Sequence, residues 1–228
     1  MVIGAWFSSI DRKTMKILER VFIESQIQGK YATGISYIQD GMIKTIKRAG
    51  SAEEFFENYD LTDCINEDNG LYLIGHTRYS TSDLRDNQPI SNDNFSVVHS
   101  GAISPVDREN WMYPTKTSTD AELILKSFEI ESHPFIDFPE STMAVCTLDV
   151  EKKTLNGFRN HEIPLWYTIT TEGIIFTSTR NISEKADVVG AAEKCEMFIN
   201  HAVGQGRLKG VAFSEISKLD KNMFMNLH

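Results

Sequence analysis

The sequence has few cysteines, no excess of positive charge and no long apolar run. Cys64, Cys146 and Cys195 are odd in number, widely spaced and form no C-x-x-C pair, which excludes a disulfide framework and a zinc ribbon. No run reaches the roughly 18 apolar residues that span a bilayer, and the N-terminus lacks the pattern of a signal peptide. We therefore expect a protein of the cytoplasm without membrane contact.

The charge balance argues against nucleic acids and anionic lipids as partners. With 23 basic and 32 acidic residues, the chain has a net charge of -9, which repels phosphate backbones and anionic lipids. Lys44, Lys47 and Arg48 form only a short basic strip, which we interpret as a solvated face. The glycines match neither G-x-G-x-x-G nor a P-loop, so no nucleic acid and no nucleotide cofactor is expected.

The pattern of apolar residues predicts many strands and two main helices. Asp11 and the Ser51–Glu54 and Thr119–Glu122 segments are typical of helix starts, the last two as capping boxes. The predicted helices are 11–28, a short one from 51, and 119–131; the predicted strands are 2–8, 35–38, 42–46, 71–77, 95–99, 143–149, 154–159, 165–170 and 174–178. Helices grouped apart from the strands favour mostly antiparallel sheets in an α+β protein.

A single domain over residues 1–228 is expected, because the sequence has no internal repeat and no linker-like tract. Only about 50 residues follow the last predicted strand, and they predict a closing helix and strand, with Cys195 in the helix and turns at Gly204–Gly206 and Gly210. We therefore expect no synthase domain.

Four blocks of sequence occur in an informative order. They are Gly29–Ile35, Gly75-His76-Thr77-Arg78-Tyr79-Ser80-Thr81, Val97-Val98-His99-Ser100-Gly101 and Thr119-Asp120-Ala121-Glu122. They resemble the motifs R-G-x-D-x-x-G-I, G-H-T-R-[WY]-[AS]-T, V-V-H-N-G and [ST]-D-[ST]-E of the class II glutamine amidotransferase domain, an N-terminal nucleophile (Ntn) hydrolase. The resemblance covers about the first 130 residues. It implies a four-layer αββα sandwich of two mostly antiparallel sheets flanked by helices.

The same blocks supply groups that suit a free amino acid. An arginine fork fits a carboxylate and an aspartate fits an ammonium group. The resemblance assigns these roles to Arg78 and Asp120. The residues themselves leave two alternatives open: Arg78 could form a structural ion pair, and Asp120 could stabilise a helix N-terminus.

The remaining candidate ligand residues are Tyr79, Thr81, Ser100 and Gly101. Tyr79 and Thr81 would line the same pocket, or else pack at the end of a strand. His76 and His99 have no second ligand at i+2 or i+4, so we interpret them as buried sheet histidines and expect no metal.

The chain departs from the family pattern where the chemistry should occur. The family attacks glutamine with an N-terminal cysteine, and Val2 stands at that position. Ser100 replaces the asparagine that donates to the oxyanion, a loss that typically lowers turnover by about 10²- to 10³-fold. Residues 29–34 also lack the acidic residue of the family. We therefore assign no catalytic residue.

Three hypotheses follow. The first is a degenerate class II amidotransferase-like protein that cannot hydrolyse glutamine and acts as a ligand-sensing or protein-binding module, with glutamine or a related amino acid and a protein as partners. The second is an active stand-alone amidotransferase or amidohydrolase with an atypical nucleophile, which delivers ammonia to a separate partner. The third is a structural protein with no small ligand.

Overall fold

The computed structural model describes residues 1–79, 83–104, 106–160, 162–195, 198–202 and 207–210. These residues form two antiparallel sheets. The first has the strand order β11-β9-β10-β1-β4-β2-β3. Its strands are β1 (Val2–Phe7), β2 (Ala32–Gln39), β3 (Met42–Ala49), β4 (Leu71–Arg78), β9 (Trp166–Ile169), β10 (Gly173–Thr177) and β11 (Ala192–Lys194).

The second sheet has the order β13-β12-β8-β7-β6-β5. Its strands are β5 (Ile90–Ser91), β6 (Phe95–Ala102), β7 (Thr142–Asp149), β8 (Thr154–Arg159), β12 (Phe198–Ala202) and β13 (Arg207–Gly210). The helices are α1 (Arg12–Glu24), α2 (Ala52–Glu57), α3 (Ala121–Glu129), α4 (Pro134–Asp137) and α5 (Arg180–Lys185). Short 3-10 turns are η1 (Ser25–Gln28), η2 (Leu61–Cys64), η3 (Leu84–Asp86) and η4 (Arg108–Asn110).

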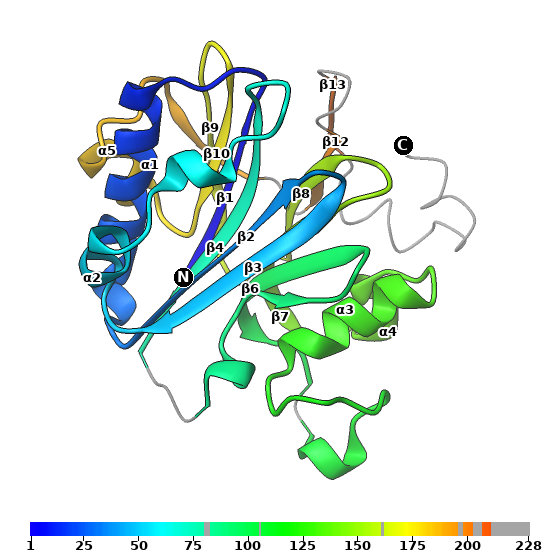
Figure 1. The fold of residues 1–228 in the computed structure, drawn as a ribbon. Coiled ribbons are helices and arrows are strands. Elements are labelled where there is room, and N and C mark those ends of the chain that lie inside the picture. The colour runs from blue at the N-terminus through cyan, green and yellow to red at the C-terminus, as the bar shows by residue number, and fades with distance from the viewer. Residues whose placement is uncertain (80–82, 105, 161, 196–197, 203–206, 211–228) are drawn as a thin grey trace.

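Three apolar layers hold four layers of secondary structure together. Leu18 and Phe22 of α1 pack with Phe55 of α2 against the first sheet. Ile74 of β4 and Cys146 of β7 lie in the apolar layer between the sheets. A third cluster joins the second sheet to α3 and α4. Figure 1 shows α1, α2 and α5 on one side of the sheets and α3 and α4 on the other, so the expected αββα sandwich is confirmed.

Local sequence signals explain several element boundaries. The Asp11 carboxylate accepts a hydrogen bond from the Thr14 backbone N–H at 2.7 Å and caps α1. Ser51 and Glu54 form the predicted capping box at the start of α2. Asp40 and Gly41, with φ values of 55° and 70°, make the predicted tight hairpin between β2 and β3.

Two local predictions are wrong. Asp120, not Thr119, is the N-cap residue of α3. The Glu122 carboxylate accepts from the backbone N–H groups of Lys116 and Thr117, because the preceding loop folds back over the helix start. Cys195 follows β11 instead of lying in a helix, and its backbone N–H donates to the Leu165 carbonyl at 2.8 Å. The turns predicted at Gly204–Gly206 lie outside the described residues.

Candidate functional site

Arg78 ends β4, a strand paired on both sides, so its position is set by the sheet. β4 lies between β1 and β2, and Arg78 is the register partner of Ala32. The guanidinium Nη1 donates to the Asp86 carbonyl at 3.0 Å and lies 3.5 Å from Asn87 Oδ1. No carboxylate among the described residues forms an ion pair with it, so the structural ion pair considered above is not found there.

His76 lies two residues earlier on β4 and is buried. Its Nε2 is 3.3 Å from the Met1 α-amine, which also donates to the Thr77 carbonyl at 2.7 Å. Burial, followed by the charges of the amine, of His99 and of Arg78, holds the pKa of His76 well below its ordinary value. Burial and then the Arg78 charge lower the pKa of the Met1 amine to about 5. Both groups are therefore neutral at pH 7, and Arg78 is the local cation.

Gln88 holds the second buried histidine from two directions. Its side-chain carbonyl accepts the His99 backbone N–H at 2.5 Å, and its amide nitrogen lies 3.0 Å from His99 Nδ1. The amide group donates in the second contact, so Nδ1 accepts and a neutral ring carries its proton on Nε2. That nitrogen lies 3.3 Å from Asp120 Oδ1. The histidine thus presents an N–H towards the carboxylate.

The Asp120 carboxylate is oriented by the fold. Its second oxygen accepts the Ile103 backbone N–H at 2.9 Å, and its side chain makes no capping bond to α3. Burial opposes ionisation, but the interaction with His99 and the hydrogen bond from Ile103 together lower the pKa of Asp120. The side chain is 25% exposed, which leaves one face open to a ligand. Asp120 is therefore a preorganised anion at the start of α3.

A hydrogen-bonded bridge joins the surroundings of Arg78 and Asp120. Asp86, whose carbonyl accepts from Arg78, uses its carboxylate to accept from the Ser118 backbone N–H at 2.8 Å and from the Ser118 hydroxyl. Ser118 lies two residues before Asp120. A cation at the end of β4 and an anion at the start of α3 are thus linked through Asp86 and Ser118.

The other candidate residues are distributed around these two. Tyr79 is 71% exposed, and its ring lies 5.5 Å from that of Tyr31. Ser100 is half-buried on β6 beside His99. Gly101 has φ 116°, and an added Cβ would lie 2.0 Å from the Thr142 carbonyl, so only glycine fits. Thr81 lies outside the described residues.

The three cysteines lie in the apolar layers of the fold. Cys64 belongs to the layer under α1, and Cys146 and Cys195 to the layer between the sheets. Burial raises the pKa of Cys64 and of Cys195 to about 12 and that of Cys146 well above its ordinary value. The negative charge of Asp63 also raises the pKa of Cys64, but it contributes less than burial. None of these thiols is a nucleophile at neutral pH.

Sequence reasoning missed the supporting residues Asp86, Gln88 and Ser118. They lie in polar loops that carry no periodic signal, and only the position of Gln88 before Pro89 marked it as a turn residue. Among the described residues, no group of three or more His, Cys, Asp and Glu side chains could hold a metal ion. No helix within the described ranges is long and apolar enough to cross a membrane.

Comparison with known proteins finds relatives both by sequence and by structure. The amidophosphoribosyltransferase of Pyrococcus horikoshii is 32% identical over 137 residues, covering 56% of this chain and 28% of that protein. The glutamine phosphoribosylpyrophosphate amidotransferase from B. subtilis, complexed with ADP and GMP, superposes with a TM-score of 0.62 at 17% identity. No protein-family model matches the chain.

A second solved structure, described as the allosteric regulatory enzyme of purine biosynthesis, superposes with a TM-score of 0.63 at 16% identity. Each superposition covers 85% of this chain and 44% of the solved one. The chain therefore spans less than half the length of these relatives, and the structural likeness is one of fold.

Proposed function

We propose, from the homology of this chain to amidophosphoribosyltransferase and its shared Ntn-hydrolase fold, that it is a class II glutamine amidotransferase-like domain that binds an amino acid without hydrolysing it. Its ligand is glutamine or a close relative, its setting is the cytoplasm, and its effect is exerted through a protein partner.

The observation that carries the proposal is the separation of binding groups from nucleophiles. Arg78 and Asp120 carry unlike charges, and Asp86 and Ser118 connect their surroundings, which suits the carboxylate and the ammonium of an α-amino acid. All three thiols are buried in apolar layers instead. Neither Met1 nor Val2, which opens β1, carries a thiol or a hydroxyl group. The geometry therefore supports binding better than cleavage.

Side-chain hydroxyl groups near the start of β1 offer no ready replacement. The Ser178 hydroxyl accepts the Val2 backbone N–H at 2.8 Å and lies 3.3 Å from the Val2 carbonyl. Both contacts tie β1 to the end of β10. The Thr77 hydroxyl donates to the Ser25 carbonyl at 2.9 Å. Both hydroxyl groups are therefore already engaged in hydrogen bonds to the backbone.

Calorimetry tests binding and an ammonia assay tests hydrolysis. We expect glutamine, glutamate or asparagine to bind the full chain, Arg78→Ala and Asp120→Ala each to weaken that binding at least about tenfold, and no ammonia to be released. Asp93→Asn, an exposed acidic position elsewhere, is the matched control and should bind normally. Absence of binding by all three amino acids would favour a purely structural protein.

A diazoketone analogue of glutamine tests for a hidden nucleophile. It alkylates an activated thiol or hydroxyl group, and we expect no mass increase after incubation with the native protein. A covalent adduct, or ammonia release that is abolished in Arg78→Ala, would instead establish the active amidotransferase of the second hypothesis. N-terminal sequencing of the native protein then shows whether processing exposes a different first residue.

A further inference from the structure

A cavity of about 370 Å³ opens at the opposite end of β1 from Met1. It is lined by the last residues of β1, by the hairpin between β2 and β3, by the loop before β4 and by the turn between β7 and β8. The length of β1 places it roughly 20 Å from the Met1 end at 3.3 Å per residue. Its volume lies within the range of small-molecule sites, about 300–1,000 Å³. It is separate from the site around Arg78 and Asp120.

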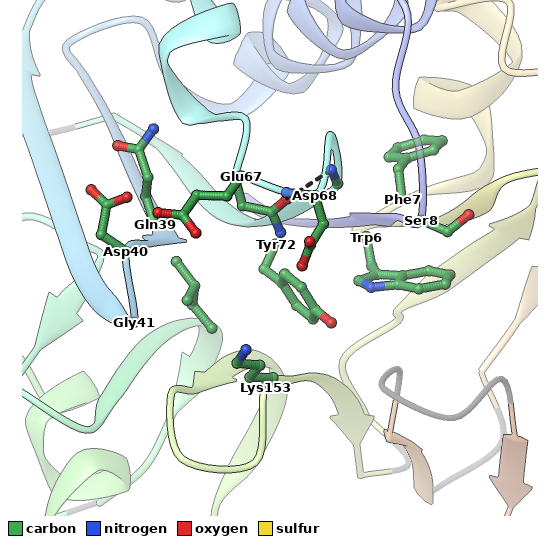
Figure 2. Close-up of a pocket in the computed structure, with 13 residues that line it drawn as sticks. Trp6, Phe7, Ser8, Gln39, Asp40, Gly41, Glu67, Asp68, Tyr72 and Lys153 are labelled. Carbon is green, nitrogen blue, oxygen red and sulfur yellow. Dashed lines mark hydrogen bonds between the residues drawn. The ribbon is translucent and has the colours of Figure 1, made fainter.

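The walls of this cavity carry charges of both signs that are not paired with each other. Figure 2 shows Glu67 and Asp68 on one side, Lys153 on the opposite side, and the ring of Tyr72 between them. Within the described part of the chain, no ion pair or side-chain hydrogen bond engages these three charged groups. Asp40, a third carboxylate on the wall, is already paired with Lys44 at 3.0 Å. Two carboxylates and one ammonium group thus remain for a ligand.

The loops that carry these charges are fixed by hydrogen bonds. Asn66 Oδ1 accepts the backbone N–H groups of Asp68 at 3.0 Å and Gly70 at 2.8 Å. The Lys153 backbone N–H donates to the Val150 carbonyl at 3.3 Å, and Lys153 has φ 48° in the tight turn. Binding would therefore order side chains but not the backbone, which lowers its entropic cost.

Aromatic residues form the remaining wall. The rings of Trp6 and Tyr72 lie 6.4 Å apart in an edge arrangement, and both are half-buried against the layer between the sheets. A guanidinium or ammonium group against such rings gains a cation–π attraction in addition to its ion pairs. The wall therefore favours a ligand whose cation is carried on an apolar stem.

We propose that this cavity is a second ligand site, which binds a basic α-amino acid of the arginine or lysine type. Such a molecule carries one carboxylate and two cationic groups, the complement of Lys153 on one wall and of Glu67 and Asp68 on the other. Neutral amino acids lack the second cation, and simple amines lack the carboxylate. The site is independent of the proposed glutamine site, because the two share no residue.

Calorimetry on the full chain with L-arginine, agmatine and citrulline tests each part of this assignment. Arginine is expected to bind, agmatine to bind at least about tenfold more weakly for want of the carboxylate, and citrulline likewise for want of the cation. No arginine binding at about 10 mM, or equal binding of all three compounds, would overturn the proposal.

Substitutions locate the site. Lys153→Gln should remove the preference for arginine over agmatine, and Glu67→Gln or Asp68→Asn should weaken arginine binding at least about tenfold. Two exposed control changes match these variants in charge: Lys13→Gln removes one positive charge, as Lys153→Gln does, and Asp93→Asn removes one negative charge, as Asp68→Asn does. Both controls should leave arginine binding unchanged. If the control substitutions weaken arginine binding as much as the cavity substitutions do, the attraction is a non-specific effect of charge and the proposed site is refuted. Asp120→Ala should affect glutamine binding alone, so the two proposals can fail separately.

Discussion

The two ends of the sheet sandwich use polar residues in opposite ways. At the Arg78 end, His76, His99 and Asp120 have buried atoms with partners inside the fold. At the Trp6 end, Glu67, Asp68 and Lys153 are exposed, and their charges are directed into a cavity without an ion pair between them. Buried groups without partners are costly, whereas exposed charges are not. Polar substitutions should therefore destabilise the first end and alter only binding at the second.

The largest difference should come from a matched pair of glycine substitutions. In Gly34→Ala the new Cβ would lie 2.3 Å from the Gln88 carbonyl, whereas in Gly41→Ala it meets nothing within 4 Å. We expect a loss of about 3 kcal/mol of unfolding free energy for Gly34→Ala from overpacking. Gly41→Ala should cost about 1 kcal/mol, from its φ of 70° alone. Urea unfolding of both variants measures the difference, and equal losses would contradict the comparison.

The next effect concerns Asp120. Asp120→Asn removes the charge that attracts His99 and should lower the unfolding free energy by about 1–2 kcal/mol at pH 7. The pKa of Asp120 is lowered in the fold, so its stabilising contribution is present above the unfolded value of about 3.9 and is lost as pH falls through the folded pKa. Denaturant titrations at pH 7, 5 and 3 should show the two proteins converging in acid. A difference in unfolding free energy that stays the same at all three pH values would show that the charge of Asp120 is not its cause.

A smaller effect should appear in the pH dependence of stability. The pKa of His76 is far below its ordinary value, so below about pH 6.5 the unfolded chain binds a proton that the folded state refuses. Stability should therefore decrease from pH 7 to pH 5, with up to about 1.4 kcal/mol per pH unit from this group. His76→Gln should reduce that slope even though it lowers stability at pH 7. An unchanged slope would show that other groups dominate.

The smallest effect is expected at the Trp6 end. Asp68→Asn leaves the backbone N–H to Asn66 Oδ1 bond intact and should change the unfolding free energy by about 0.5 kcal/mol or less. The same variant is expected to lose arginine binding, so calorimetry should detect a large change where urea unfolding detects almost none. A large loss of stability would show that the carboxylate supports the loop instead.

Much of the fold could be predicted because its signals are local. Asp11, the Ser51–Glu54 box and the Asp40-Gly41 turn act within a few residues, and the structure confirms each of them. Thr119 does not form the predicted capping box, because the Glu122 carboxylate accepts instead from the backbone N–H of Lys116, six residues before it. Cys195 was misplaced because its pairing with Leu165 is a long-range contact that leaves no periodic pattern. Local sequence signals therefore predict an element correctly unless a segment outside that element forms hydrogen bonds with the same groups.

The sequence by itself determined nine of the strands, the helices α1 to α3, the acidic charge and the resemblance that drew attention to Arg78 and Asp120. Only the tertiary structure decided that the loop residues Asp86 and Ser118 connect the surroundings of these two groups and that Gln88 holds His99. It also decided that Glu67 and Lys153 line one cavity. Glu67 and Lys153 are 86 positions apart in the sequence. Propensity and periodicity act over a few residues, whereas the meeting of such distant side chains depends on strand register and sheet packing.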